Sequence, residues 1–518
     1  MYCLKLGSSV IAFGLLFGTI SMADSEPLRA KNFIYVVPDG YGVASQVLAR
    51  DYSSLIDGLS TKERPDSEKL GVDSMVIGTV RTHSSNSLIT DSAAAATAFA
   101  CGIKTYNGAV GVDNDGKPVG SILEAAHLSG YKTALVVTSR ITHATPAGYS
   151  AHVFHRDSEN EIASHQIGLT HPMGSVVDLL MGGGLQHYLP PSKGGKRTDG
   201  VDLIDWATKK GFTFVNQKSD FEQLSANGKT SLPFLGLFAH DHLAYEIDRD
   251  PAQEPSLLEM TKFALETLEA TTADSEKGYF IMIEASRIDH AAHSNDAAAH
   301  LHDVLMYNKV MAYLREFITS HPDTQMLSAA DHETGGLTLA HGYDPLVLKR
   351  ARHSGQNLMA VFASYKGENR AQFLKERILP QYGILAATDD EVDVYLSLYD
   401  RVGASAMDRA IVTAFSAEAG LHWSTGEHTA ADVLLHGFAS GNQYDEMKRL
   451  IGFSQNNINL PRYIEMVLGV NMSDATAALR KEGANLTQQK RHQGRDLRCG
   501  QGACAGIFIE SAGNIMSV

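Results

Sequence analysis

Four short apolar runs recur along the chain, and each contains β-branched residues. The runs are FIYVVP (33–38), KTALVV (132–137), YFIMIE (279–284) and TQMLSAA (324–330). Longer segments between them repeat their apolar positions with helical spacing, notably residues 255–271 and 298–318. Buried runs that alternate with amphipathic helices are typical of a parallel sheet covered on both faces. The pattern therefore predicts an α/β fold with a mostly parallel central sheet and helices on both faces.

The alternation of strands and helices weakens between residues 340 and 420, so we expect an inserted subdomain there. The chain has 518 residues, a length that suits one large α/β domain with insertions or two or three smaller domains. No long low-complexity linker divides it. We therefore expect one large domain over residues 24–518 that contains the insertion.

The first 23 residues have the composition of a secretory signal peptide. Lys5 supplies a positive charge, residues 6–20 form an apolar run, and residues 21–23 place small side chains at the cleavage-defining positions. An uncleaved membrane anchor is the alternative, but the run is shorter than the ~20 apolar residues that a spanning helix needs. We therefore expect export to the periplasm or secretion, without a stable membrane anchor.

The cysteines agree with an oxidising compartment. Cys3 lies in the signal segment, and Cys101 lies in an alanine-rich segment where we expect it to be buried. Cys499 and Cys504 are separated by a short loop with two glycines, and export favours a disulfide between them. A zinc ribbon is the weaker alternative, because the sequence has no second cysteine pair.

The net charge of −15 comes from 59 acidic and 44 basic residues. Without a basic surplus, nucleic acid is not expected to be the main partner. An acidic protein also repels an anionic substrate, unless bound cations reverse the charge locally. A function that acts on phosphate would therefore require metal ions in this chain.

The stretch ITDSAAAATAFACG (89–102) places an acid and a hydroxyl directly before a run of small residues. One interpretation is structural: Thr90 or Asp91 caps a helix that packs closely because it is rich in alanine. The other is functional: Ser92 lies where free backbone N–H groups and the helix dipole favour an anion, so it could bind or attack phosphate. The stretch alone leaves both interpretations open.

Polar side chains follow all four predicted strands, at the sheet edge where α/β proteins form their binding sites. They are Asp39 after the first strand; Arg140, His143 and Thr145 after the second; Glu284, Asp289, His290 and His293 at the end of the third; and Asp331 and His332 after the fourth. Each has an ordinary explanation as a turn, a helix cap or a surface pair. Together, however, so many carboxylates repel one another unless cations lie between them. Asp/His sets suit zinc, and Asp/Glu/Thr sets suit magnesium.

Seven motifs of the chain resemble those of the alkaline phosphatase family, in the same order. They are VVPDGYG, TDSAAAATAFACGIKTYNG, HATPAGYSAHV, MGGG, EASRIDHAAHSND, ADHETGGL and GEHTAADV, and they are spread between residues 33 and 439. The resemblance implies hydrolysis of small phosphate monoesters to an alcohol and inorganic phosphate. It also implies two Zn²⁺ ions and one Mg²⁺ ion, a homodimer, and a crown-like character for the insertion at 340–420.

The resemblance further implies a role for each matching residue. Ser92 would be the nucleophile that becomes phosphorylated, and Arg156 would bind the phosphate. The metal ligands would be Asp289, His293 and His428 for the first zinc; Asp331, His332 and Ser92 for the second zinc; and Thr145 and Glu284 for the magnesium, with Asp39 shared by the second zinc and the magnesium. His143 would lie beside the magnesium ligands, and His290 and Asp91 would lie near the substrate.

Two other classes of function stay open at this point. The nearest alternative is a phosphodiesterase or another hydrolase of the same superfamily. A sulfatase is not expected, because no cysteine stands in the C-x-P-x-R context from which its modified nucleophile is made. A non-catalytic metal- or phosphate-binding protein is the second alternative, but an intact Ser92 with a complete ligand set argues against it.

Overall fold

The structure is a computed structural model, and it describes residues 29–59, 61, 70–227 and 230–482. The expected signal peptide and the expected pair Cys499–Cys504 lie outside the described residues. Cys101 is buried, as the sequence predicts. No helix among the described ranges is long and apolar enough to cross a membrane.

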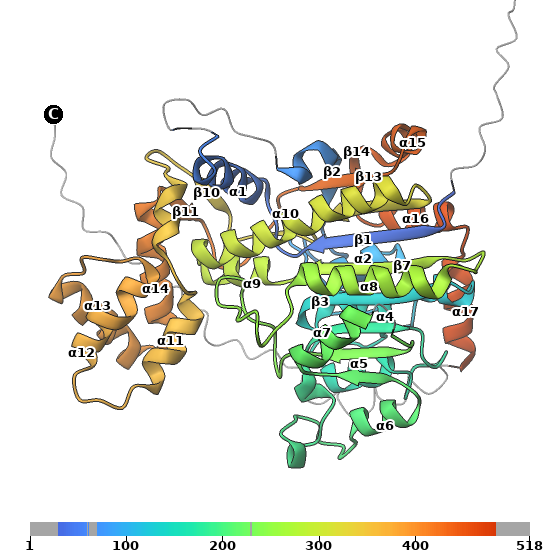
Figure 1. The fold of residues 1–518 in the computed structure, drawn as a ribbon, viewed down its shortest axis with the longest axis horizontal. Helices are drawn as coiled ribbons and strands as arrows, with labels where there is room; N and C mark the ends of the chain where they lie inside the picture. The colour runs from blue at the N-terminus through green and yellow to red at the C-terminus, as the bar shows by residue number, and fades with distance from the viewer. Residues whose placement is uncertain (1–28, 60, 62–69, 228–229, 483–518) are drawn as a thin grey trace, which may run out of the picture.

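A ten-stranded sheet forms the centre of the fold and confirms the predicted fold class (Figure 1). Its strands, in spatial order, are β14 (Phe453–Asn456), β2 (Val76–Arg81), β13 (Val433–Phe438), β8 (Thr324–Ala329), β1 (Asn32–Pro38), β7 (Tyr279–Ala285), β3 (Lys132–Arg140), β4 (Leu179–Gly183), β6 (Phe234–Leu237) and β5 (Thr213–Val215). β13 pairs antiparallel with both of its neighbours, and the other described pairings of this sheet are parallel. The four apolar runs of the sequence are the adjacent central strands β8, β1, β7 and β3.

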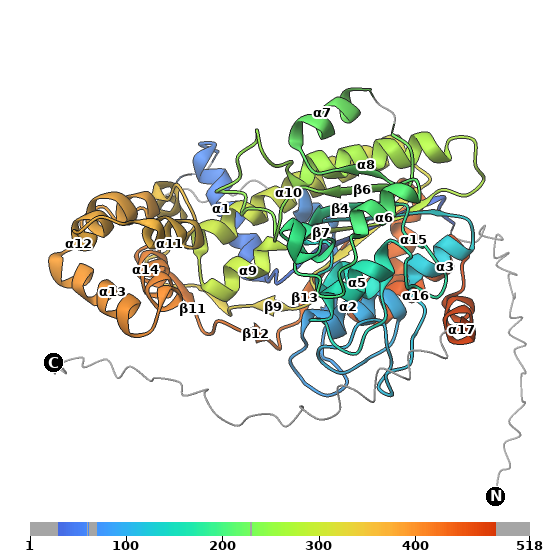
Figure 2. The ribbon, with the colours of Figure 1, turned by 90° about the horizontal axis from the view of Figure 1, so that it is seen from below.

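Helices cover both faces of the sheet, with α8 and α10 on one face and α2, α3 and α16 on the other (Figure 2). The helices are α1 (Val43–Ile56), α2 (Ser92–Cys101), α3 (Ile122–Leu128), α4 (Ala144–Ser150), α5 (Glu159–Gln166), α6 (Leu203–Lys209), α7 (Lys218–Asn227), α8 (Leu257–Thr272), α9 (Arg287–Ser294), α10 (Ala297–Ser320), α11 (Gly355–Ser364), α12 (Arg370–Phe373), α13 (Asp389–Arg401), α14 (Ala404–Glu418), α15 (Asn442–Ile451), α16 (Asn459–Leu468) and α17 (Met472–Glu482). Because strands such as β1 and β7 are buried along their whole length, they carry continuous apolar runs rather than an alternating pattern.

The parallel register brings the carboxyl ends of the central strands together. Glu284 on β7 pairs with Val37 of β1 on one side and with Val137 of β3 on the other. Asp39 therefore lies two residues beyond the pair on β1, and Asp331 follows β8 at the same edge. Side chains that are 245 or more residues apart in the sequence thus meet at one edge of the sheet.

Helices α11 to α14 lie together beyond one end of the sheet, beside the short strands β10 (Leu337–Leu339) and β11 (Leu421–Trp423) (Figure 1). Asp296, the N-cap residue of α10, connects this part to the sheet domain. Its carboxylate accepts hydrogen bonds from the backbone N–H of Gly355 at 2.8 Å and from the Tyr382 hydroxyl at 2.5 Å. The helices are therefore fixed to the element that directly follows α9, which carries part of the predicted site.

Candidate active site

The structure confirms the structural interpretation of the stretch 89–102. Asp91 is the N-cap residue of α2, and its Oδ1 accepts a hydrogen bond from the backbone N–H of Ala94 at 2.9 Å. Ser92 is the first residue of the helix and is 2% exposed. Its Oγ lies 3.1 Å from Nε2 of His332, which comes from the far end of β8. The helix cap and the hydroxyl that faces His332 are thus on neighbouring residues.

The alanine-rich composition of α2 allows α4 to pack close to it. A Cβ atom added at Gly148 of α4 would lie 2.8 Å from the Cβ of Ala96, so neither position has room for a larger side chain. Thr145, in the first turn of α4, is fully buried on the side of the sheet that α2 covers. Small residues therefore bring the helix of Ser92 and the helix of Thr145 into direct contact.

Asp289, His293 and His428 form the first group of predicted metal ligands that the structure brings together. Asp289 Oδ2 lies 3.3 Å from His293 Nε2, one helical turn along α9. Asp289 Oδ1 lies 3.7 Å from His428 Nε2. His428 arrives on the two-residue strand β12 (His428–Thr429), which pairs with β9 (Glu333–Thr334). These ligand atoms lie within 4.8 Å of one another.

The two histidines of this group are oriented as metal ligands usually are. His293 Nδ1 donates to the carbonyl of Gly426 at 2.7 Å, and His428 Nδ1 donates to the carbonyl of Thr90 at 2.9 Å. Each ring therefore directs Nε2 toward the group, with the proton on the other nitrogen. The two Nε2 atoms are only 3.1 Å apart. Two facing lone pairs at this distance repel each other unless a proton or a metal cation lies between them.

His332, Asp331 and Asp39 form the second group, next to Ser92. His332 Nε2 lies 3.2 Å from Asp331 Oδ2 and 3.7 Å from Asp39 Oδ1. The hydroxyl of Thr334 donates to Asp289 Oδ1 at 2.6 Å and accepts from His332 Nδ1 at 3.1 Å. This fixes the tautomer of His332, so its Nε2 lone pair faces Ser92. Asp289 lies between the two groups, because its ligand oxygen is also near those of Asp39 and His332.

Asp39, Thr145 and Glu284 supply the third group, and four of their five side-chain oxygens lack hydrogen-bond partners among the described residues. Both carboxylate oxygens of Asp39, Oγ1 of Thr145 and Oε1 of Glu284 are buried without a hydrogen-bond partner among the described residues. Asp331 Oδ2 is also buried without a hydrogen-bond partner among these residues. Buried carboxylate oxygens are costly to leave unsatisfied, so these atoms fit hard divalent cations with oxygen ligands.

The raised pKa values of the carboxylates agree with the assignment of these oxygens to divalent cations. Burial, followed by repulsion from neighbouring carboxylates, raises the pKa of Asp39 well above its ordinary value. Burial raises the pKa of Glu284 to about 7 and the pKa of Asp331 to about 6. The three carboxylates therefore need either protons or cations to share one buried space. Divalent cations fit the donor set, because they match both its charge and its unpartnered oxygens.

Arg156 contacts Asp91, the residue that directly precedes Ser92. Its Nη1 lies 3.2 Å from Asp91 Oδ2, and its Nη2 donates to His143 Nε2 at 3.1 Å. The ring of His143 packs edge-on against the ring of His290, with centroids 5.4 Å apart. Arg156, Asp91, His143 and His290 are thus linked by contacts, and Asp91 contacts both the arginine and the first turn of α2.

Two residues of the site are not predicted by the pattern of strands and helices. Thr334 orients His332 and Asp289, but it belongs to a strand of only two residues. The ring of His242 packs against that of His290 at a tilt of 59°, with centroids 4.4 Å apart, and its Nδ1 accepts a hydrogen bond from the backbone N–H of Arg140 at 3.0 Å. It lies in a loop between β6 and α8, where no periodicity predicts where a side chain points.

Comparisons with known proteins identify relatives along most of the chain. Residues 30–470 match the family model described as alkaline phosphatase. The chain is 39% identical to the repressible alkaline phosphatase of Saccharomyces cerevisiae, over 91% of this chain and 88% of that protein. It is 30% identical to alkaline phosphatase 4 of Bacillus subtilis, over 84% of this chain and 91% of that protein.

Solved structures agree with the sequence comparisons. The crystal structure of Thermus thermophilus alkaline phosphatase superposes with a TM-score of 0.73 at 27% identity, and the match covers 91% of this chain and 100% of that one. The fold, the family model and the curated relatives therefore agree over nearly the same residues. The chain belongs to the alkaline phosphatase family.

Proposed function

We propose that this enzyme, which hydrolyses phosphate monoesters, works in two steps through Ser92. In the first step, Ser92 Oγ attacks phosphorus, the bond from phosphorus to the alcohol oxygen breaks, and the alcohol leaves with a proton. In the second step, water attacks the phosphoserine, inorganic phosphate leaves, and the serine hydroxyl is restored. The observation that carries this proposal is the position of Ser92 Oγ, 3.1 Å from His332 Nε2 at the edge of the carboxylate and histidine cluster.

The three groups of ligands would hold three divalent cations. Asp289, His293 and His428 would hold one zinc ion, and Asp331, His332 and Ser92 would hold the other. Thr145 and Glu284 would hold magnesium, with Asp39 shared between magnesium and the second zinc. When bound, these cations would supply the positive charge that attracts the phosphate dianion and offsets charge on its oxygens during transfer.

The protein's own groups would orient the substrate. Arg156 presents a guanidinium that can donate two parallel hydrogen bonds to phosphate oxygens, and its contacts with Asp91 and His143 fix its direction. The first turn of α2 directs free backbone N–H groups toward an anion at Ser92. These positive and donor groups account for a phosphate site inside a protein with a net charge of −15.

A rapid-quench experiment with p-nitrophenyl phosphate tests the proposal. Under conditions where hydrolysis of the phosphoenzyme is slower than its formation, we expect a burst of p-nitrophenol and a phosphorylated peptide that contains Ser92 in the mass spectrum. In Ser92→Ala, with metals bound, the phosphopeptide and the burst should be absent and turnover should be close to background. Wild-type turnover in Ser92→Ala would contradict the covalent scheme.

The preference for monoesters is tested by a second substrate. The ratio of kcat/KM for p-nitrophenyl phosphate to that for bis-p-nitrophenyl phosphate should strongly favour the monoester, because only a dianion matches the charge of three cations and Arg156. A ratio in favour of the diester would make the enzyme a phosphodiesterase of the same superfamily.

We also propose that the protein is exported and forms a homodimer. The sequence of residues 1–23 supports export, and the family resemblance supports a dimer. N-terminal sequencing of the native protein should find a chain that begins at residue 24, and light scattering should give twice the mass of that chain. An intact N-terminus or a monomeric mass would contradict the corresponding statement.

A further inference from the structure

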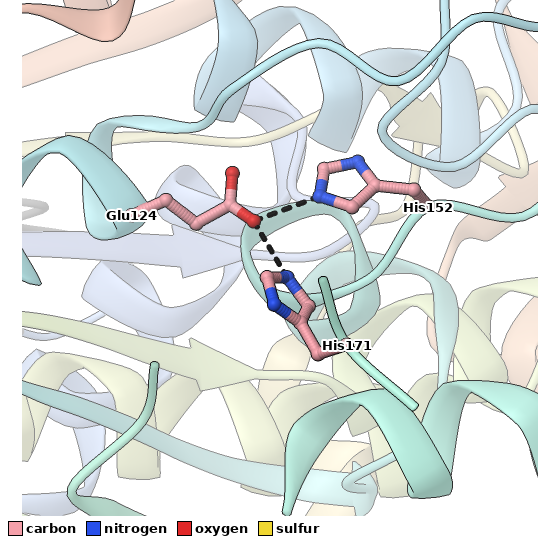
Figure 3. A group of neighbouring side chains, drawn as sticks. All are labelled: Glu124, His152 and His171. Carbon is pink, nitrogen blue, oxygen red and sulfur yellow. Dashed lines mark hydrogen bonds and ion pairs between the residues drawn. The ribbon is translucent and has the colours of Figure 1, made fainter. Parts of the chain in front are cut away.

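A second cluster of ionisable side chains lies apart from the candidate active site, between α3 and the loops after α4 and α5. Glu124, His152 and His171 have side chains that are at most 1% exposed. Figure 3 shows both imidazole rings directed at the same carboxylate oxygen. His152 Nε2 lies 2.7 Å and His171 Nε2 lies 2.8 Å from Glu124 Oε1.

The spacing of these atoms identifies protons, not a metal ion, as what holds the cluster together. In the candidate metal site, the paired ligand atoms of Asp289, His293 and His428 are 3.1 to 3.7 Å apart. Ligand atoms that share a tetrahedral zinc ion at ~2.0 Å are separated by roughly 3.3 Å. The contacts of Glu124 are as short as direct hydrogen bonds and leave no room for an ion.

The other ring nitrogens show where the protons are. His171 Nδ1 accepts the backbone N–H of Met173 at 3.1 Å, so His171 carries its proton on Nε2 and donates it to Glu124. His152 Nδ1 lies 2.7 Å from the carbonyl oxygen of Gly111, which can only accept. Since His152 Nε2 also faces an acceptor, both nitrogens of this ring donate. His152 is therefore an imidazolium, and Glu124 is a carboxylate.

The charge balance of the pair agrees with this distribution of protons. Burial alone would lower the pKa of His152, but the charge and hydrogen bond of Glu124 outweigh burial and raise it. Burial would raise the pKa of Glu124, but His152 and then His171 hold it far below its ordinary value. The second carboxylate oxygen accepts the backbone N–H of Ser121 at 2.7 Å, so no part of the buried charge lacks a partner.

The imidazolium connects α3 to the chain segment that carries Arg156. His152 stands four residues before Arg156, in the extended segment after α4. The backbone N–H of His152 donates to His165 Nδ1 at 3.2 Å. Nδ1 of the His152 ring faces the carbonyl oxygen of Gly111 in the neighbouring segment. One ring thus joins Glu124, Gly111 and the backbone that leads to the arginine.

The segment of Gly111 in turn holds both Arg156 and the cap of the nucleophile helix. Val110 and Val153 exchange two backbone hydrogen bonds, of 3.2 and 3.0 Å. The backbone N–H of Arg156 donates to the carbonyl of Gly108 at 2.8 Å, and the N–H of Gly108 donates to Asp91 Oδ2 at 2.9 Å. Displacement of the paired segments 108–111 and 151–156 would therefore move Arg156 relative to Ser92.

We propose that the Glu124–His152 ion pair is a positioning element, which fixes the ribbon of residues 108–111 and 151–156 so that Arg156 faces phosphate. The proposal rests on the phosphate-binding role proposed for Arg156. The positive charge is essential to it, because the two acceptors lie on opposite sides of one ring and only an imidazolium donates from both nitrogens. A neutral side chain at position 152 would satisfy one acceptor and leave the other unpaired.

The test compares His152→Gln with wild type, each in an unchanged background and in an Arg156→Ala background. We expect His152→Gln to raise the KM for p-nitrophenyl phosphate and the Ki for inorganic phosphate by roughly tenfold, with a smaller effect on kcat. In the Arg156→Ala background, the same substitution should change either constant by less than ~2-fold, because residues that act through one another are not additive. Equal losses in both backgrounds would show a merely structural role and overturn the proposal.

Tyr131→Phe is the matched control. It removes a buried hydrogen bond of 2.7 Å between the Tyr131 hydroxyl and the carbonyl of Leu468, near the end of α3, without a contact to the ribbon. We expect its KM and Ki to equal those of wild type. If Arg156→Ala itself left Ki unchanged, the role of Arg156 and this proposal would both fail, while the phosphoserine experiment would still stand on its own.

Two measurements keep the proposal testable where a variant fails to fold. In the wild-type enzyme with metals bound, ¹⁵N spectra of labelled histidine should show a ring with both nitrogens protonated at about pH 8, where a free histidine is neutral. Glu124→Gln should bind as many metal ions per chain as wild type. Absence of a doubly protonated ring, or loss of one metal equivalent in Glu124→Gln, would overturn the proposal in favour of a neutral cluster or a metal site.

Discussion

Replacement of Gly40 by alanine should disrupt both groups that we propose bind zinc, because Gly40 contacts Asp289 and Asp331. Gly40 has a φ of +73°, and a Cβ atom there would lie 2.7 Å from the Cα of Asp289. Its backbone N–H also donates to Asp331 Oδ1 at 3.3 Å. The new methyl group would therefore push against the backbone of α9 on one side and disturb a ligand from β8 on the other.

The magnitude of this effect has two parts. A left-handed backbone conformation costs an L-residue about 1–2 kcal/mol. Overpacking against backbone that cannot move away costs about 1–3 kcal/mol more. We therefore expect Gly40→Ala to lower the free energy of unfolding of the metal-free protein by about 2–5 kcal/mol. Because Asp289 moves with α9, we also expect weaker zinc binding and lower turnover.

Gly58→Ala is the matched control, since Gly58 has a φ of +70° and no atom within 4 Å of an added Cβ. It shares the backbone strain and the change in unfolded-chain entropy, so the difference between the two variants isolates the steric effect. The assays are urea unfolding of the metal-free proteins, zinc content after reconstitution, and turnover of p-nitrophenyl phosphate. Equal stability and zinc content in the two variants would refute the close packing of Gly40 against Asp289.

Three further predictions concern the metals and their supports. Prolonged dialysis against EDTA should abolish turnover, and zinc with magnesium should restore it; full activity after verified metal removal would contradict the proposed site. Relative to a Glu284→Gln, Asp331→Asn double variant, the metal-free protein should lose stability in urea as the pH rises from about 5 to about 8, because the raised pKa values of Asp331 and Glu284 mean that these two groups bind protons more tightly in the folded state than in the unfolded state. An increase in stability relative to the double variant over this range would have the wrong sign. Thr334→Val should weaken zinc binding about 10–100-fold, measured by competition with a chelator, because His332 and Asp289 lose the hydroxyl between them. Unchanged zinc affinity would show that this hydroxyl does not orient the ligands.

The sheet and its polar edge could be predicted from the sequence because parallel strands obey simple rules. Buried apolar runs indicated β8, β1, β7 and β3, and the residues that follow such strands must lie at one edge. Asp39, Glu284 and Asp331 are close together for this reason. His428 follows no long strand, and only the motif resemblance predicted its place beside Asp289.

The supporting residues could not be predicted in the same way, because loops and short strands have no periodicity. Thr334 and His242 reach the site from such segments. The sequence left the helix cap and a reactive hydroxyl open as alternatives, but the two are compatible, because Asp91 caps α2 while the adjacent Ser92 hydroxyl faces His332. His152 lies within a matching motif, but its charge depends on Glu124 and Gly111, which are distant in the sequence.

Anomalous diffraction from crystals of the metal-loaded enzyme at the zinc absorption edge tests the central claim most directly. The account predicts one strong peak among Asp289, His293 and His428 and a second beside Ser92, Asp331 and His332. Crystals from zinc-replete enzyme that show no peak at either position, with Ser92 Oγ directed away from the cluster, would contradict it.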